Sequence, residues 1–248
     1  EWVYNEDLND EILEGSNVTF KNGTLKSDNN KIMIQNYCNL TLDNMTVEDT
    51  NAQYVVSNNC GNISINNTTI NAGSNANQFA FDVCGYAKYT AGVTVTVSGT
   101  SVINGKVEIS KSAGNTEPMK LNITGGTFNG DLKVDASVGT ENAKSIISVS
   151  GGTFSDPSVL KYMATNATVD IKLLSNINIA KTELATGYIL NAANATANLN
   201  LNGHDIINSS ETADATPFTQ IFTVQNGTLN ISGNGNVKCD ASATAKDD

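Results

Sequence analysis

The sequence predicts an all-β protein whose backbone winds as a parallel β-helix, or β-solenoid, of about nine coils. Three observations lead to this prediction. A six-residue turn phrase recurs along the chain, an alternating apolar pair precedes nearly every copy, and Asn, Thr, Ser and Gly replace much of the usual apolar content. A solenoid tolerates such a composition because each coil buries only a thin strip of side chains, which it shares with two neighbours.

The turn phrase consists of an apolar residue, four polar or small residues and a second apolar residue, and successive copies begin 22 to 32 residues apart. The copies lie at residues 20–25, 42–47, 65–70, 97–102, 123–128, 149–154, 174–179, 201–206 and, in a looser form, 231–237. Glycine and asparagine reach positive φ at low cost, so they can turn the chain sharply between two short strands. The expected turn residues are Gly23, Gly99, Gly125, Gly151 and Gly203, with Asn22, Asn44 and Asn67 in other coils. Asparagines in stacked corners can also hydrogen-bond to those one coil away.

A short strand precedes each turn. Leu40 and Leu42 alternate with polar residues, which is the pattern of a half-buried strand. We expect such side chains to point inward and to stack on their equivalents one coil away, at the strand spacing of about 4.8 Å. The other pairs are Val18/Phe20, Val95/Val97, Leu121/Ile123, Ile147/Val149, Leu199/Leu201 and Leu229/Ile231. A β-sandwich also has short alternating strands, but its hairpins do not require the same turn phrase at each step, so the solenoid is favoured.

The expected domains are an N-terminal cap at residues 1–16, a single β-helix at 17–240 and a polar tail or the start of a linker at 241–248. Because the end of the chain is polar and carries no second cap, we expect the chain to be part of a larger polypeptide.

Several segments interrupt the period. Residues 5–14 carry Leu8, Ile12 and Leu13 at helical spacing and predict a short helix over the open end of the stack. Asp156 followed by Pro157 predicts one or two helical turns that end near Thr165. Irregular excursions are expected at residues 85–92, 180–196 and 208–219.

The charge excludes two classes of partner. The chain of 248 residues has a formal net charge of −11, with 14 lysines, no arginine and 25 carboxylates. Nucleic-acid binding needs a basic stripe that displaces counterions, and an anionic membrane surface would repel this chain. We find no apolar run of 18 residues, so membrane insertion is not expected either.

The cysteines leave three interpretations open. Cys38, Cys60 and Cys84 are about one coil apart and should lie near one another on one edge of the stack. They can form a ladder of small buried side chains, or Cys38 and Cys60 can be bridged, since adjacent coils bring Cα atoms into bridging range. A metal site is the third possibility, although the pair spacings usual in zinc sites are missing.

Other candidates for chemistry have simpler structural explanations. His204 is the only histidine, and its place in a turn already explains a polar residue. Paired carboxylates suffice for glycoside hydrolysis, and the candidates are Asp43, Asp49 and Asp82 in neighbouring coils and Asp131 with Asp135. Solvated faces and loops account for these residues as well. The sequence therefore predicts no catalytic, cofactor-binding or metal-binding residue and no cofactor.

Residues 147–164, 197–206 and 221–235 resemble repeats in large secreted or wall-anchored surface proteins of gut-type bacteria. The resemblance covers residues 17–240 and implies a right-handed parallel β-helix of the pectate-lyase-like kind. The lyases of that superfamily rely on an Arg or Lys base with calcium carboxylates, and its hydrolases use Asn-Thr-Asp, Asp-Asp and Gly-His-Gly strings. This chain has no arginine and none of these strings, so no functional residue is carried over.

We therefore expect a non-catalytic module of the bacterial cell surface, adhesin-like or a structural stalk, that is extracellular. Its expected partners are glycans or host surface proteins, and Tyr86 and Tyr89 are candidate contacts. The alternative is a carbohydrate-active enzyme of the same superfamily, a polysaccharide hydrolase or a lyase-like enzyme. A virion fibre would require a homotrimer, and an ice-binding array would require more Thr-x-Thr motifs than the one at Thr94 and Thr96.

Overall fold

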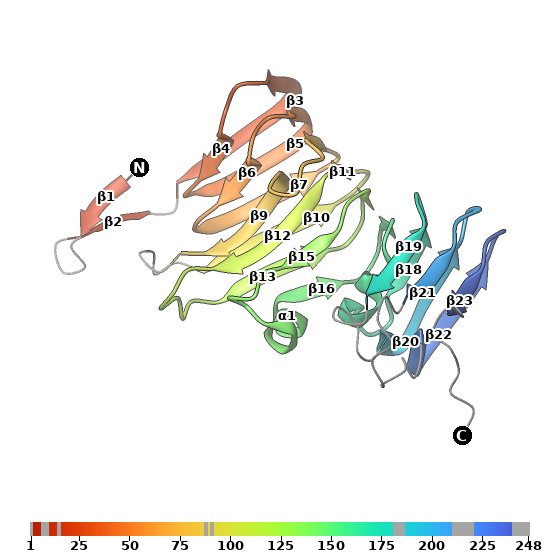
Figure 1. The fold of residues 1–248 in the computed structure, drawn as a ribbon. Helices are drawn as coiled ribbons and strands as arrows, with labels where there is room; N and C mark the ends of the chain where they lie inside the picture. The colour runs from red at the N-terminus through yellow and green to blue at the C-terminus, as the bar shows by residue number, and fades with distance from the viewer. Residues whose placement is uncertain are drawn as a thin grey trace. The chain divides into compact units, whose positions relative to one another are not determined.

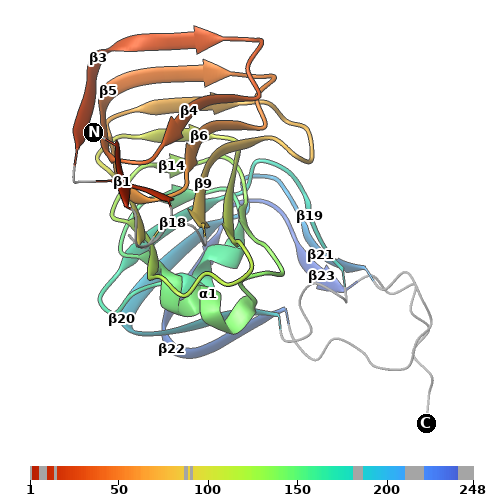
Figure 2. The same cartoon turned by 90° about the vertical axis from the view of Figure 1, so that its left-hand side faces the viewer.

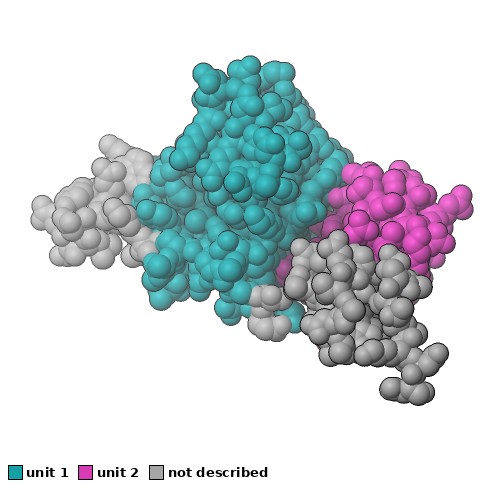
Figure 3. Space-filling model, in the orientation of Figure 1, with its two compact units in different colours: residues 1–152 teal, residues 153–248 magenta. Residues whose placement is uncertain are grey.

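The computed structural model is an all-β parallel β-solenoid of about seven turns (Figure 1). It describes residues 2–5, 10–13, 16–86, 89, 92–180, 187–209 and 221–239, and the chain divides into two compact units, 1–152 and 153–248 (Figure 3). The expected fold class is thus confirmed, with a lower number of coils. The structure has about seven turns where about nine coils were expected. In residues 157–162, a 3₁₀-helix takes the place of a strand.

The first unit contains three rows of parallel strands. The first row pairs strands β3, β5, β7, β10, β13 and β16 in that order. The second row continues from the later part of β5 through β8 and β11 to β14, and the third row pairs β4, β6, β9, β12 and β15. Figure 2 shows members of the first and third rows stacked coil upon coil.

The bounds of these strands follow the order of the chain. They are β3 (Asn17–Ser27), β4 (Ile32–Asn36), β5 (Asn39–Asp49), β6 (Tyr54–Asn58), β7 (Gly61–Asn66), β8 (Thr69–Ala72), β9 (Phe79–Gly85), β10 (Val93–Ser98), β11 (Val102–Asn104), β12 (Lys106–Lys111), β13 (Met119–Ile123), β14 (Thr127–Phe128), β15 (Leu132–Val134) and β16 (Ile147–Val149). One α-helix, α1 (Thr140–Ile146), precedes β16, and the sequence analysis did not anticipate it.

Columns of identical position form the core, as the alternating pairs predicted. Leu42, Ile65, Val97, Ile123 and Val149 are register partners on successive strands, and each is fully buried. Each side chain therefore packs on the one a coil above and the one a coil below. Because apolar burial contributes about 25 cal/mol per Å², this shared strip is the main stabilising element of a chain with so few aromatic residues.

The turns use left-handed residues, as expected, with two corrections. Asn22, Asn44, Asn67 and Gly99 have φ values of 56°, 54°, 48° and 63° and occupy equivalent places in successive coils. In the two Gly-Gly phrases the second glycine adopts positive φ, Gly126 at 94° and Gly152 at 111°, rather than Gly125 and Gly151. Gly23 does not adopt it either, because Asn22 beside it makes the turn.

The second unit contains β17 (Thr153–Phe154), η1 (Pro157–Tyr162), β18 (Thr168–Lys172), β19 (Ile177–Ala180), β20 (Tyr188–Asn200), β21 (Ile206–Ser209), β22 (Phe222–Ser232) and β23 (Val237–Cys239). Strands β17, β18, β20 and β22 pair in parallel, and so do β19, β21 and β23. The predicted helical turns are confirmed as η1, whose start is capped by the Asp156 carboxylate accepting from the Ser158 N–H at 2.6 Å.

Two predicted interruptions are wrong where the structure describes them. Residues 188–196 belong to strand β20, although its pairing with β22 shifts register between Asn191 and Thr196, while 181–186 lie outside the described residues. Residues 10–13 form β2 (Asp10–Leu13), which pairs antiparallel with β1 (Trp2–Asn5), where a helix was expected. Of the excursion at 208–219, residues 208 and 209 lie in β21 and the others lie outside the described residues.

The pairings described between residues 17 and 239 are parallel, which rules out the hairpins of a β-sandwich. In the part of the chain that the structure describes, no helix is long and apolar enough to cross a membrane.

Candidate binding site

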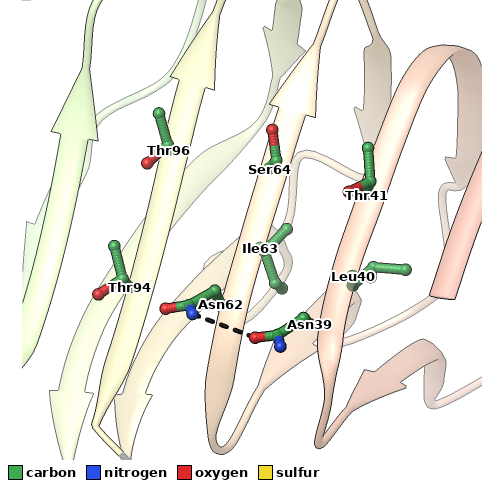
Figure 4. Close-up of a pocket in the computed structure, with 8 residues that line it drawn as sticks. All are labelled: Asn39, Leu40, Thr41, Asn62, Ile63, Ser64, Thr94 and Thr96. Carbon is green, nitrogen blue, oxygen red and sulfur yellow. Dashed lines mark hydrogen bonds between the residues drawn. The ribbon is translucent and has the colours of Figure 1, made fainter. Parts of the chain in front are cut away.

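An open groove of about 390 Å³ lies on the first strand row, over β5, β7 and β10 (Figure 4). Such a volume falls within the range of small-molecule sites, about 300–1,000 Å³. The lining residues are Asn39, Leu40, Thr41, Asn62, Ile63, Ser64, Thr94 and Thr96.

Strand alternation explains this lining. Leu40 and Ile63 are buried in the core, so the polar residues on either side of them face outward. The outward residues form two columns across the strands because the pairing is parallel and in register. One column contains Asn39, Asn62 and Thr94, and the other contains Thr41, Ser64 and Thr96.

The groove offers hydroxyl and amide groups at regular spacing, about 4.8 Å across strands and about 6.6 Å along them. Asn62 Nδ2 donates to Asn39 Oδ1 at 3.1 Å, which fixes both amides (Figure 4). None of the eight lining residues is ionisable. The groove can therefore bind a neutral polar ligand by hydrogen bonds, and it holds no acid or base of its own.

The predicted carboxylates do not form one site. Lys21 Nζ pairs with Asp43 Oδ2 at 2.9 Å and Asn66 Nδ2 donates to Asp43 Oδ1 at 2.9 Å, and these contacts lower the pKa of Asp43. Asp49 is fully buried and accepts from the N–H groups of Asn51 and Ala52 at 3.0 and 2.9 Å, so it holds a turn. Asp82 lies in the third row, on β9.

Asp131 and Asp135 lie on either side of β15. Asp135 Oδ1 accepts from the N–H of Ser137 at 2.8 Å, and the hydrogen bonds from Ser137 lower the pKa of this carboxyl. Asp131 contributes its backbone carbonyl to the N–H of Val107 at 2.9 Å. Both residues thus have structural roles beside β15.

An acidic pair in the third row, the buried Asp82 and the half-buried Glu108, was not predicted from the sequence. Asp82 and Glu108 are register partners on β9 and β12, and Tyr54 donates its hydroxyl to Glu108 Oε2 at 2.6 Å. Asp82 is 3% exposed and accepts from the N–H of Asn58 at 2.5 Å and the hydroxyl of Ser57 at 3.2 Å. Burial raises the pKa of Asp82 to about 7. The spacing of one coil between residues 82 and 108 was the signal that could have found this pair.

Cys38, Cys60 and Cys84 are free thiols, so the alternative of a Cys38–Cys60 bridge is wrong for this structure. Cys60 is buried, whereas Cys38 and Cys84 are only half-buried. Burial raises the pKa of the Cys60 and Cys84 thiols to about 11, which disfavours the thiolate needed for metal binding. Among the described residues, no group of three or more His, Cys, Asp or Glu side chains could hold a metal ion.

His204 lies in the turn between β20 and β21, where the sequence placed it. Its backbone N–H donates to the backbone carbonyl of Leu201 at 2.8 Å. This backbone hydrogen bond closes the turn in which His204 lies.

The two predicted tyrosines belong to a cluster of three. The ring centroids of Tyr86 and Tyr89 lie 5.7 Å apart, and that of Tyr89 lies 5.3 Å from that of Tyr37. Tyr37 was missed because it lies some 50 residues before the others in the sequence and meets them only through the stacking of coils.

Comparison with known proteins identifies no relative of this chain. No protein-family model, no curated protein and no solved structure matches the chain.

Proposed function

We propose that this chain is a non-catalytic, adhesin-like module of an extracellular bacterial surface protein, of the pectate-lyase-like right-handed β-helix kind, and that it binds glycans in the groove over β5, β7 and β10. The observation that supports binding is the lining itself, six outward hydroxyl and amide side chains with no ionisable group. Carbohydrates are recognised by such arrays because each sugar hydroxyl both donates and accepts. Host glycoproteins would present the same chemistry.

The lining also argues against the alternative of a carbohydrate-active enzyme. Glycoside hydrolysis requires two carboxyl groups that face the substrate about 5 to 9.5 Å apart. Asp82 and Glu108 are register partners on neighbouring strands, but Asp82 is 3% exposed and lies in another strand row from the groove. A substrate in the groove would meet neither of them.

The test is a screen of microbial and host glycans, followed by titration of the hits against two variants. Ser64→Tyr fills the centre of the groove and should abolish binding. Ser148→Tyr is the matched control because residue 148 is exposed and continues the same outward column on β16, about 14 Å away. Equal loss in both variants, or no binding to any glycan, would overturn the proposal. Release of reducing ends from the hits would instead favour the enzyme.

A further inference from the structure

A tyrosine cluster lies within a few residues, along the chain, of the strand starts that border the groove. Because β5, β7 and β10 are parallel, their first residues lie along the same edge of the row. Asn39, Asn62 and Thr94, the first column of the groove, are at or next to these strand starts.

Two connections bring the tyrosine cluster to this edge. Tyr37 precedes Asn39 by two residues, a span of at most about 7 Å. Gly92 follows Tyr89 by three residues and immediately precedes β10, and its carbonyl accepts from the N–H of Gly61 at 3.2 Å. The cluster is thus attached to the starts of both β5 and β7.

The geometry of the cluster suits contact with a ligand. Tyr86 is 40% exposed, a large fraction for an aromatic ring, and Tyr89 packs between Tyr86 and Tyr37 with the rings tilted by 39° and 56°. The thiol of Cys60 donates to the carbonyl of Tyr37 at 3.5 Å and helps to hold the base of the cluster. The outer ring is therefore presented by a packed support.

We propose that Tyr86, supported by Tyr89 and Tyr37, is an aromatic subsite that stacks on one ring of an uncharged oligosaccharide whose next units occupy the polar groove. This inference rests on the proposed function. A tyrosine ring covers the apolar C–H face of a pyranose while leaving its hydroxyls to water or to side chains. Sites that combine an aromatic wall with a few oriented polar groups are typical of small-molecule recognition.

The charge of the chain selects the class of sugar. None of the eight groove residues is ionisable, and the net charge of −11 repels polyanions at long range. Uronate and sulfated chains would thus lose affinity without gaining an ion pair in the groove, whereas a neutral chain loses nothing.

The test uses the full chain with neutral hexasaccharides and disaccharides of glucose, galactose and mannose, and with hexagalacturonate as the acidic probe. Isothermal titration should find at least one neutral hexasaccharide that binds, with Tyr86→Ala weakening it by about 3- to 10-fold, as expected for an aromatic contact. Tyr86→Phe should retain the affinity because the ring is kept. Leu174→Ala removes another exposed apolar side chain, 51% exposed, and should change nothing.

The outcomes separate the two proposals. If Ser64→Tyr abolishes binding of the hexasaccharide but Tyr86→Ala leaves its Kd unchanged, the proposed aromatic subsite is wrong, whereas glycan binding in the groove is supported. If hexagalacturonate binds more tightly than every neutral chain, the proposed class of sugar is wrong. If no probe binds, both the subsite and the groove are wrong. Unchanged melting temperatures of the variants would show that each is folded.

Discussion

Individual residues with positive φ set the corners of the coils, and glycine is essential only where a second backbone comes close. Gly61 has φ of +81°, and a Cβ atom there would lie 2.5 Å from the carbonyl oxygen of Cys38 in the preceding coil. Gly114 has nearly the same φ, +82°, with no atom within 4 Å of its Cβ position. The two residues therefore separate the effect of backbone conformation from that of packing.

Gly61→Ala should destabilise the protein much more than Gly114→Ala. The left-handed conformation costs a non-glycine residue about 1–2 kcal/mol in either place. At Gly61 the Cβ clash adds a backbone shift, so the total should reach about 3 kcal/mol or more. Urea unfolding followed by circular dichroism measures both changes. Equal losses of unfolding free energy would show that the stacked coils absorb the clash.

Across elements, polar side chains form ladders that run from coil to coil. Asn71 Nδ2 donates to Glu48 Oε2 at 3.0 Å, Asn104 Nδ2 to Asn71 Oδ1 at 2.8 Å, and Asn129 Nδ2 to Asn104 Oδ1 at 2.7 Å. Glu48 also pairs with Lys26 at 2.5 Å. Asn71 and Asn104 thus each accept from the next coil and donate to the previous one, which ties the register of neighbouring strands.

Removing a middle rung of this ladder should cost more than removing its last rung. Asn104→Ala loses one donated and one accepted bond, whereas Asn129→Ala loses the donated bond alone. At about 1 kcal/mol for each neutral hydrogen bond, the expected losses of unfolding free energy are about 2 and about 1 kcal/mol. A cost for Asn129→Ala that equals or exceeds that of Asn104→Ala in urea titrations would contradict a continuous ladder.

The same elements show what the sequence could and could not predict. The core column through Leu42 and the left-handed turns at Asn22 and Asn44 were predictable because one local pattern determines each of them. The groove and the Tyr37 contact depend on the register between coils, which no local pattern specifies. Residues 188–196 were expected to be irregular because Ala and Asn have low β-propensity. They lie in β20, where residues 188–191 pair with β22, but the register shifts between Asn191 and Thr196, around the left-handed Asn194.

For the whole molecule, two opposing sets of carboxyl groups determine how stability depends on pH. Hydrogen bonds with lysine and asparagine lower the pKa values of Asp43, Glu48 and Asp205. These groups contribute stability above their unfolded pKa values, and it is lost as the pH falls through the lower, folded values. Asp82 acts in the opposite sense because burial raises its pKa to about 7.

We therefore expect maximal stability between about pH 4 and pH 5 and a decline towards pH 8. In the unfolded chain Asp82 releases its proton near pH 3.9, but in the folded protein it holds the proton up to about pH 7. Between these values the folded state binds more protons than the unfolded state, so the unfolding free energy falls with rising pH. A shift of about three units corresponds to at most about 4 kcal/mol. Urea titrations from pH 3 to pH 9 measure the profile.

Asp82→Asn isolates the alkaline part of this profile. The amide has the shape of the protonated carboxyl, and its oxygen can still accept from the N–H of Asn58 while its Nδ2 donates to Ser57, whose hydroxyl can accept. The variant should match the parent protein near pH 3, below the unfolded pKa of Asp82, and exceed its stability increasingly from about pH 5 to pH 8. Asp205→Asn, which removes an exposed pair with Lys238, should change the acid part alone. A parent profile that is flat from pH 5 to pH 8 would mean that Asp82 is ionised in the folded protein, and the third row would then have to accommodate a charge beside Glu108.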